Sequence, residues 1–336
     1  MRKLFFLVVC WLPVVSLAVD WEEQTVFNAQ EGAPLLRVIS STDTAFFAPI
    51  IESFVADNPA VSIEYSVTGS VDVYERFKDT SAQFDVVISS AMDLQIKLVN
   101  DGYALQLEDF AHPDWAHWRH SLFGFTLEPA AIVVNNAAFS TTAIPQSRQE
   151  MIEVLRTNPN EFRGKVGTYD VRRSGLGYLF ATQDARTSET YWRLMEVMGN
   201  LNTQLYCCSG DMIEDLAQGR IAISYNVLGS YALARTDLAD KITVVLPSDF
   251  PTTMMRTALV SGKTKQSALS TSFVRHLASS SWRDQAVDIF PAPSSLQASS
   301  GSAQQSTIAL EPGLMIYLDR LKRQAFIEAW ESAIIQ

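Results

Sequence analysis

Short β-rich runs alternate with amphipathic helical stretches along most of this chain, and that alternation limits the folds open to it. In the first third, strands are expected at 35–39, 61–67 and 85–88. Helices are expected to follow them at 45–56, 70–78 and 91–100. Three consecutive strand–helix units predict a parallel sheet covered by helices, and so an α/β fold.

A second α/β block follows an apolar crossing strand at 130–134. Its further strands are expected at 165–168 and 221–225, and its helices at 149–156, 177–184, 189–199 and 211–218. Two more strands are expected at 242–246 and 258–261, where the chain returns to the first block, and a helix at 270–279. A loop at 290–306 and two helices within 308–335 complete the chain. We interpret the two blocks as lobes joined by a hinge, with 19–132 plus 252–336 in lobe 1 and 133–251 in lobe 2. A cleft between such lobes, at the carboxyl ends of strands, is the natural ligand site.

The first eighteen residues have the layout of a secretory signal peptide. Arg2 and Lys3 precede an almost wholly apolar run, and small residues stand at 16–18. The run is about twelve residues, whereas a helix needs roughly 20 to cross a bilayer. Cys10 follows a large valine, which makes it a poor lipidation site. We expect cleavage of 1–18 and a mature, exported chain that begins near Val19.

Composition and charge remove several functional classes. Hydrophobic residues make up 47% of the chain and charged residues 19%, which favours a packed core over disorder. Loss of Arg2 and Lys3 with the signal takes the net charge from −11 to −13, so nucleic-acid binding is not expected. Neither GxSxG nor HExxH occurs. We therefore predict a binding protein rather than an enzyme, without a cofactor.

Cysteine and histidine give little support for a metal or redox site. The mature chain keeps only Cys207 and Cys208, which lack CxxC spacing. They are expected either to form a vicinal disulfide or to be buried and inert, and burial is favoured. His112, His117 and His120 lie close in sequence, but the tryptophans and proline between them favour a packed surface segment over a metal site.

Several segments together resemble the type 2 periplasmic solute-binding proteins of the ferric-iron and sugar-phosphate ABC transporter family. They include RVISSTDT (37–44), FDVVISSAMD (84–93), AIVVNN (131–136), GKVGTYDVRRSGLG (164–177), GDMIEDLAQGRIAISYNVLGSYA (210–232), ITVVLPSDFP (242–251) and LDRLKRQAFIEAWES (318–332). The resemblance covers nearly the whole mature chain. It implies a monomeric, two-lobed periplasmic protein that closes around a small ligand and delivers it to an inner-membrane partner. That partner is an ABC permease or, because SSAMDLQIKLVNDGYA (89–104) resembles a sensor-associated subgroup, a histidine kinase.

Three hydroxyl-bearing loops in the first lobe are candidate ligand contacts. Each follows an expected strand and precedes an expected helix, where backbone N–H groups favour anions. The candidates are Ser40, Ser41 and Thr42, then Thr68, Gly69 and Ser70, and then Ser89 and Ser90. Ordinary helix capping, by Asp43 or Thr44 at the first loop, is the alternative interpretation of such sequences.

The second lobe is expected to supply a positive charge. Arg173 and Ser174 lie between a strand and a helix, and a guanidinium group can hold a carboxylate or phosphate. Arg172 is adjacent, and we expect only one of the two arginines to face the cleft. Further candidates in this lobe are Ser209, Tyr225 and Asn226.

The ligand expected from these residues is a small organic anion, such as a phosphorylated sugar or a polycarboxylate. Ferric iron is the alternative. Ferric members of the family use adjacent tyrosines, whereas Tyr225 and Tyr231 are six residues apart here. Ligand sensing for a histidine kinase is the other alternative.

Overall fold

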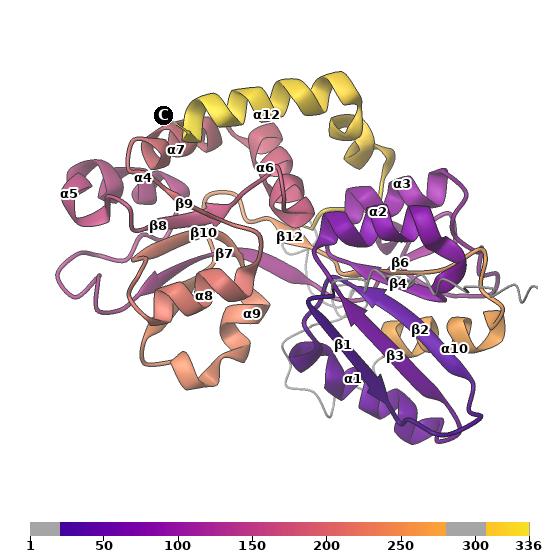
Figure 1. The fold of residues 1–336 in the computed structure, drawn as a ribbon. Helices are drawn as coiled ribbons and strands as arrows, with labels where there is room; N and C mark the ends of the chain where they lie inside the picture. Colours follow the sequence, from indigo (N-terminus) through magenta and orange to yellow (C-terminus); the bar gives the residue numbers. More distant parts are fainter. Residues whose placement is uncertain (1–20, 280–306, 336) are drawn as a thin grey trace, which may run out of the picture.

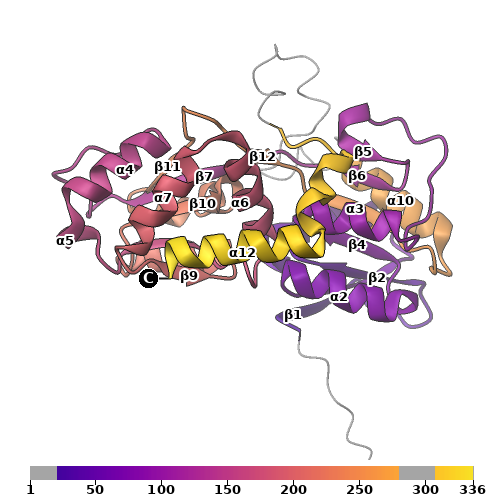
Figure 2. The ribbon, with the colours of Figure 1, turned by 90° about the horizontal axis from the view of Figure 1, so that it is seen from above.

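Two sheets, each covered by helices, form two lobes that lie side by side (Figure 1 and Figure 2). The computed structural model describes residues 21–279 and 307–335. The expected signal segment 1–18, with Cys10, and the expected loop at 290–306 lie outside the described residues. The α/β class and the two-lobed architecture are confirmed. No helix in the described ranges is both long and apolar enough to cross a bilayer.

The first lobe has a seven-stranded sheet in the order β1-β3-β2-β4-β13-β6-β5. Its strands are β1 (Glu23–Phe27), β2 (Leu35–Ser40), β3 (Ser62–Val67), β4 (Val86–Ser89), β5 (His117–Trp118), β6 (Leu122–Gly124) and β13 (Thr257–Val260). The expected parallel unit is β3-β2-β4, whereas β1 and β13 pair antiparallel to it. Successive side chains of a strand point to opposite faces of the sheet, and successive residues of β4 and β13 are buried. Both faces of this sheet are therefore apolar, and helices cover both.

Helices α2 (Ser70–Thr80) and α3 (Met92–Asn100) cover one face of this sheet, and α1 (Thr44–Asp57) and α10 (Ser267–Ala278) cover the other (Figure 1). On the α2/α3 face, Val87 packs in one apolar cluster with Phe77. On the α1/α10 face, Ile88 packs in another with Phe47. The register of β4 therefore decides which helices each of its residues meets.

The second lobe has the strand order β11-β7-β10-β8-β9, with β12 also paired to β7. Its strands are β7 (Glu128–Asn135), β8 (Val166–Tyr169), β9 (Gln204–Tyr206), β10 (Ile223–Leu228), β11 (Ile242–Val245) and β12 (Thr253–Met254). Its helices are α4 (Arg148–Thr157), α5 (Pro159–Phe162), α6 (Gly175–Thr187), α7 (Thr190–Gly199), α8 (Ser209–Ala217) and α9 (Gly229–Ala234). Short 3-10 turns occur at Ser81–Gln83, Asp114–Ala116 and Thr236–Leu238.

The C-terminal segment differs in part from the two expected helices. A 3-10 helix at Pro312–Leu318 precedes α12 (Arg320–Ile334), which Asp319 caps through Leu321 and Lys322 N–H. α12 packs on α7, where a Cβ atom at Gly199 would lie 2.1 Å from the carbonyl oxygen of Ala333. Only glycine permits that approach. The lobe borders expected at 132/133 and 251/252 stay a prediction. In the structure, β7 pairs with strands of the second sheet, and α12 packs on α7 of the second lobe.

Three crossings of the described chain join the lobes: between β6 and β7, between β12 and β13, and between the 3-10 helix at Pro312–Leu318, which contacts α3, and α12, which packs on α7. A fully buried ion pair ties the first two together, since Arg256 Nε and Nη2 lie 3.0 and 2.9 Å from the Glu128 carboxylate oxygens. Arg256 also donates to the hydroxyl of Thr42 in the first lobe, and Ser230 in the second donates to Glu128. One buried network therefore runs from lobe to lobe through the hinge.

Candidate functional site

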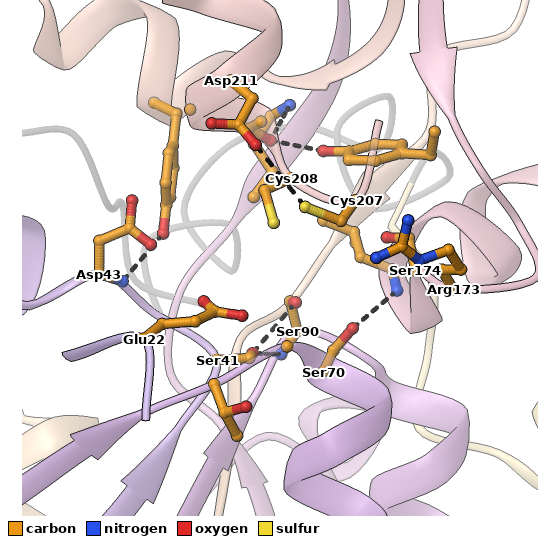
Figure 3. A pocket seen from close by; sticks show the side chains of 18 of the residues that line it. Glu22, Ser41, Asp43, Ser70, Ser90, Arg173, Ser174, Cys207, Cys208 and Asp211 are labelled. Atoms are coloured by element: carbon orange, nitrogen blue, oxygen red, sulfur yellow. Dashed lines mark hydrogen bonds between the residues drawn. The ribbon is translucent and has the colours of Figure 1, made fainter. Parts of the chain in front are cut away.

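A cavity of about 460 Å³ lies between the lobes. Its floor comes from loops that follow strands of the first sheet, and its roof comes from the second lobe (Figure 3). The lining residues are Glu22, Glu23, Ser41, Asp43, Thr68, Gly69, Ser70, Ser90, Tyr169, Arg173, Ser174, Leu176, Cys207, Cys208, Ser209, Gly210, Asp211, Leu228 and Tyr231. This volume is within the range of pockets that hold one small ligand.

Helix N-termini from both lobes meet at this cavity. α2 begins at Ser70 after the N-cap Gly69, which has no side chain, and α8 begins at Ser209 after the N-cap Cys208, whose side chain forms no capping hydrogen bond. The helix dipole and free N–H groups at such ends attract negative charge. The two ends approach the cavity from opposite lobes, which suits an anionic group held between them.

Arg173 lines the cavity, whereas its neighbour Arg172 is engaged elsewhere. Arg172 pairs with Asp170 at 2.7 Å and with Glu331 at 3.1 Å. Arg173 forms no ion pair with any residue in the described ranges, and its guanidinium lies beside Ser174 at one side of the cavity (Figure 3). It is therefore the arginine positioned to meet a ligand.

Some of the expected hydroxyl groups reach the cavity and others are used inside the protein. Ser41, Thr68, Gly69, Ser70, Ser90, Ser174 and Ser209 line it. Ser40 is buried and accepts hydrogen bonds from Thr42 N–H and Tyr65. Thr42 is held by Arg256, and Ser89 accepts from Ala91 N–H. The structure therefore does not bring Ser40, Thr42 or Ser89 into the cavity; their side chains shape the loops instead.

Tyr225 and Asn226 also lie outside the cavity, contrary to the expectation from the sequence. The hydroxyl of Tyr225 accepts a hydrogen bond from Arg148 Nε and donates to Asp184, each at 2.6 Å. Asn226 donates to the same carboxylate at 2.8 Å. The pairing of β10 with β7 is irregular between Ser224 and Val227, where Asn226 has a φ of 62°, and this irregularity turns two successive side chains toward the same buried network.

Four acidic residues line the cavity, and two of them, Glu22 and Glu23, lie outside the segments that the sequence offered as ligand contacts. Burial and the nearby Asp43 raise the pKa of Glu22, and burial and the nearby Glu23 raise the pKa of Asp43. Asp211, the fourth, is the third residue of α8. Glu22 and Glu23 reach the site only because β1 pairs antiparallel with β3, a pairing that no sequence pattern had indicated. Asp43 carried a signal, since it was read as a possible cap, but its side chain forms no capping bond.

The cysteine pair is neither bonded nor buried as expected. Cys207 is exposed and Cys208 half-buried, and both are free thiols that line the cavity. Cys207 donates to Asp211 at 3.7 Å. Partial burial raises the pKa of both thiols, and the Asp211 carboxylate adds to the effect. The Cys207, Cys208 and Asp211 ligand atoms lie within 4.8 Å of one another, whereas no such group within residues 21–279 and 307–335 includes His112, His117 or His120.

The family to which the chain belongs follows from a match over residues 36–290 to the model of bacterial extracellular solute-binding proteins. The chain is a bacterial extracellular solute-binding protein. A solved substrate-binding protein of an ABC transporter from Agrobacterium tumefaciens shares 32% identity, with coverage of 93% of this chain and 98% of that one, at a TM-score of 0.85. No curated protein matches.

More distant solute-binding proteins share the fold alone. AfuA from Actinobacillus pleuropneumoniae, solved with fructose-6-phosphate, has 14% identity and a TM-score of 0.72, over 90% of this chain and 98% of AfuA. Iron-bound HitA from Pseudomonas aeruginosa has 13% identity and a TM-score of 0.65, over 89% of this chain and 99% of HitA. These likenesses show the two-lobed fold and leave the ligand open.

Proposed function

We propose that this solute-binding protein captures a small organic ligand through an anionic group, by closure of its lobes, and delivers it to an ABC permease. The observation that carries the proposal is the meeting of the α2 and α8 N-termini with Arg173 at one cavity between the lobes. A ligand that touches both lobes binds the closed form more tightly than the open form, and so shifts the protein toward closure. Docking on a permease then depends on the closed form.

Delivery of the ligand from the periplasm to an ABC permease of the inner membrane is supported by the Agrobacterium protein, which belongs to an ABC transporter. The test is ATP hydrolysis by a candidate ABC permease with its ATPase, measured in proteoliposomes with and without the liganded protein. Stimulation that depends on ligand supports transport. Stimulation of a neighbouring histidine kinase instead would replace transport with sensing.

Direct ferric-iron binding is the weaker alternative, because only one of the two tyrosines considered for it reaches the cavity. Tyr231 lines the cavity and Tyr225 is held by Arg148 and Asp184. Burial also raises the pKa of the Tyr231 phenol well above its usual value, which opposes the phenolate that Fe(III) requires.

The ligand test is a thermal-shift screen of protein that has been unfolded and refolded to remove carried ligand. The compounds are citrate, phosphoglycerates, hexose phosphates, phosphate, and ferric iron with carbonate. A ligand present at about 100 times its Kd adds roughly 2.7 kcal/mol to the free energy of unfolding. We expect an organic anion to stabilise the protein, Arg173→Ala to abolish the shift and Arg172→Ala to retain it. Stabilisation by ferric iron alone would overturn the proposal.

A further inference from the structure

The charges that line the cavity do not match a ligand that is only anionic. Four carboxylates line it, those of Glu22, Glu23, Asp43 and Asp211. Among the described residues, Arg173 is the one basic side chain on the lining. The lining therefore carries three more acidic than basic side chains. A dianion such as a phosphate monoester would be repelled by this excess, in a site partly shielded from water.

The opposite charges are also separated in space. Glu22 and Asp43 lie on one side of the cavity, and Arg173 with Ser174 lies on the other (Figure 3). Asp43 extends toward the second lobe, since a Cβ atom at Gly210 would lie 3.8 Å from its Oδ2. The cavity therefore has an acidic side and a basic side, and a ligand that reaches both would bridge them.

On the acidic side, Glu22 accepts a hydrogen bond from the backbone of Gly69 but has no cationic partner within the part of the chain that the structure describes. No described lysine, arginine or histidine forms an ion pair with Glu22 or Asp43, although Arg256 lies near enough to oppose the rise in the pKa of Asp43. Burial is the main cause that raises the pKa of both groups, and neighbouring carboxylates add to the rise by a repulsion that a bound cation would relieve. Glu23 differs, because it accepts a hydrogen bond from Thr44 N–H at 2.9 Å.

We propose that this cleft selects a compact zwitterion, with its anionic group at Arg173 and Ser174 and its ammonium group between Glu22 and Asp43. The inference rests on the proposed function, because it adds the cationic half of the ligand to the anionic half already assigned. It accounts for an acidic lining in a site whose helix ends favour anions. It also excludes polycarboxylates and sugar phosphates as the best ligands, since neither carries the ammonium group.

The experiment compares triplets of compounds by isothermal titration calorimetry of the refolded protein. Each triplet contains a zwitterion, a matched compound with only its anionic group and a matched compound with only its amine. One triplet is O-phosphoethanolamine, ethyl phosphate and ethanolamine. The other is 4-aminobutyrate, butyrate and butylamine. At least one zwitterion is expected to bind about tenfold or more tightly than both of its half-ligands, because tenfold corresponds to about 1.4 kcal/mol and one charge-assisted contact supplies that much.

The variant Glu22→Gln should change the affinities for the zwitterion and for the plain anion in opposite directions, which misfolding would not do. It should weaken the zwitterion about tenfold and, by removing a repulsive charge, strengthen the matched plain anion severalfold. The control Glu52→Gln, at an exposed position of α1, should change neither. If Glu22→Gln weakens both compounds equally, the carboxylate does not act on the ammonium group and the proposal fails.

The outcomes also separate this inference from the proposed function. If a plain anion from the triplets or from the thermal-shift compounds binds best, the zwitterion is overturned and anion capture stands. If Zn²⁺, added because Cys207, Cys208 and Asp211 lie together, binds and no organic compound does, both fail. Absence of binding by every compound also counts against both.

Discussion

The hydroxyl oxygen of Ser70 in the first lobe lies 3.1 Å from the backbone nitrogen of Gly175 in the second, and 3.3 Å from that of Leu176. Both N–H groups belong to the first turn of α6, which lacks partners within its own helix for them. One lobe therefore caps a helix of the other. The contact lies at the edge of the ligand cavity, where it holds the two lobes together in the arrangement seen here.

Ser70→Ala should shift the ligand-free protein toward an open form. The change removes the cap that bridges the lobes, with an expected cost of about 1 kcal/mol to the closed form. The measurement is the radius of gyration by small-angle X-ray scattering. Ser174→Ala is the matched control, because Ser174 caps the same helix at Gly177 N–H from within its own lobe. It should lower stability without opening the lobes; equal opening in both variants would assign the effect to α6 alone.

Tyr225→Phe should destabilise the protein and leave ligand affinity unchanged. Its hydroxyl satisfies Arg148 and Asp184, both fully buried, so its loss should cost about 1–3 kcal/mol. Chemical denaturation and ligand titration measure the two effects. Tyr191→Phe is the control, because the hydroxyl of Tyr191 is buried with no hydrogen-bond partner and its removal should cost nothing. Loss of ligand binding with unchanged stability would contradict this prediction and show that Tyr225 acts in ligand binding.

The free energy of unfolding should fall as the pH rises toward neutrality, because of the buried carboxyl group of Asp93. Its side chain is 2% exposed, one oxygen lacks a hydrogen-bond partner, and burial raises its pKa to about 7 from an ordinary value near 3.8. Between these two values the folded protein keeps a proton that the unfolded chain releases, so stability declines through that range.

Asp93→Asn should remove that decline. The variant should gain up to about 4 kcal/mol over the native protein at pH 8 and little at pH 4, as measured by urea denaturation at each pH. Asp79→Asn, at an exposed position of α2, should leave the pH profile unchanged. A parallel profile for Asp93→Asn would show that the carboxyl group is charged and solvated in solution.

The two thiols should react at different rates, and bound ligand should slow both. Cys207 is exposed, whereas Cys208 is half-buried and its pKa is raised further. Titration with a thiol reagent at pH 8 should therefore give a faster and a slower phase. Asp211→Asn should speed the faster phase, because removal of the adjacent carboxylate lowers the pKa of Cys207. A single unreactive phase would instead indicate a disulfide between the pair.

The periodic elements could be predicted closely because their own sequences specify them. The strand expected at 35–39 is β2 at Leu35–Ser40, and the helix expected at 45–56 is α1 at Thr44–Asp57. β1 and β9 were missed, since both lie at sheet edges and owe their form to a partner strand. The hydroxyl loops were found by their place after strands, whereas Glu22 reaches the cavity only through the pairing of β1 with β3.

The position of β13 in the chain sets the order in which this protein can fold. β13 lies between β4 and β6 in the middle of the first sheet, yet the whole second sheet precedes it in sequence. The N-terminal lobe therefore cannot complete its sheet until residue 260 is present, while every strand of the other lobe is already available. A growing chain stays incompletely folded for most of its synthesis, because its central pairing spans more than a hundred residues. That delay gives an export machinery time to receive an unfolded chain.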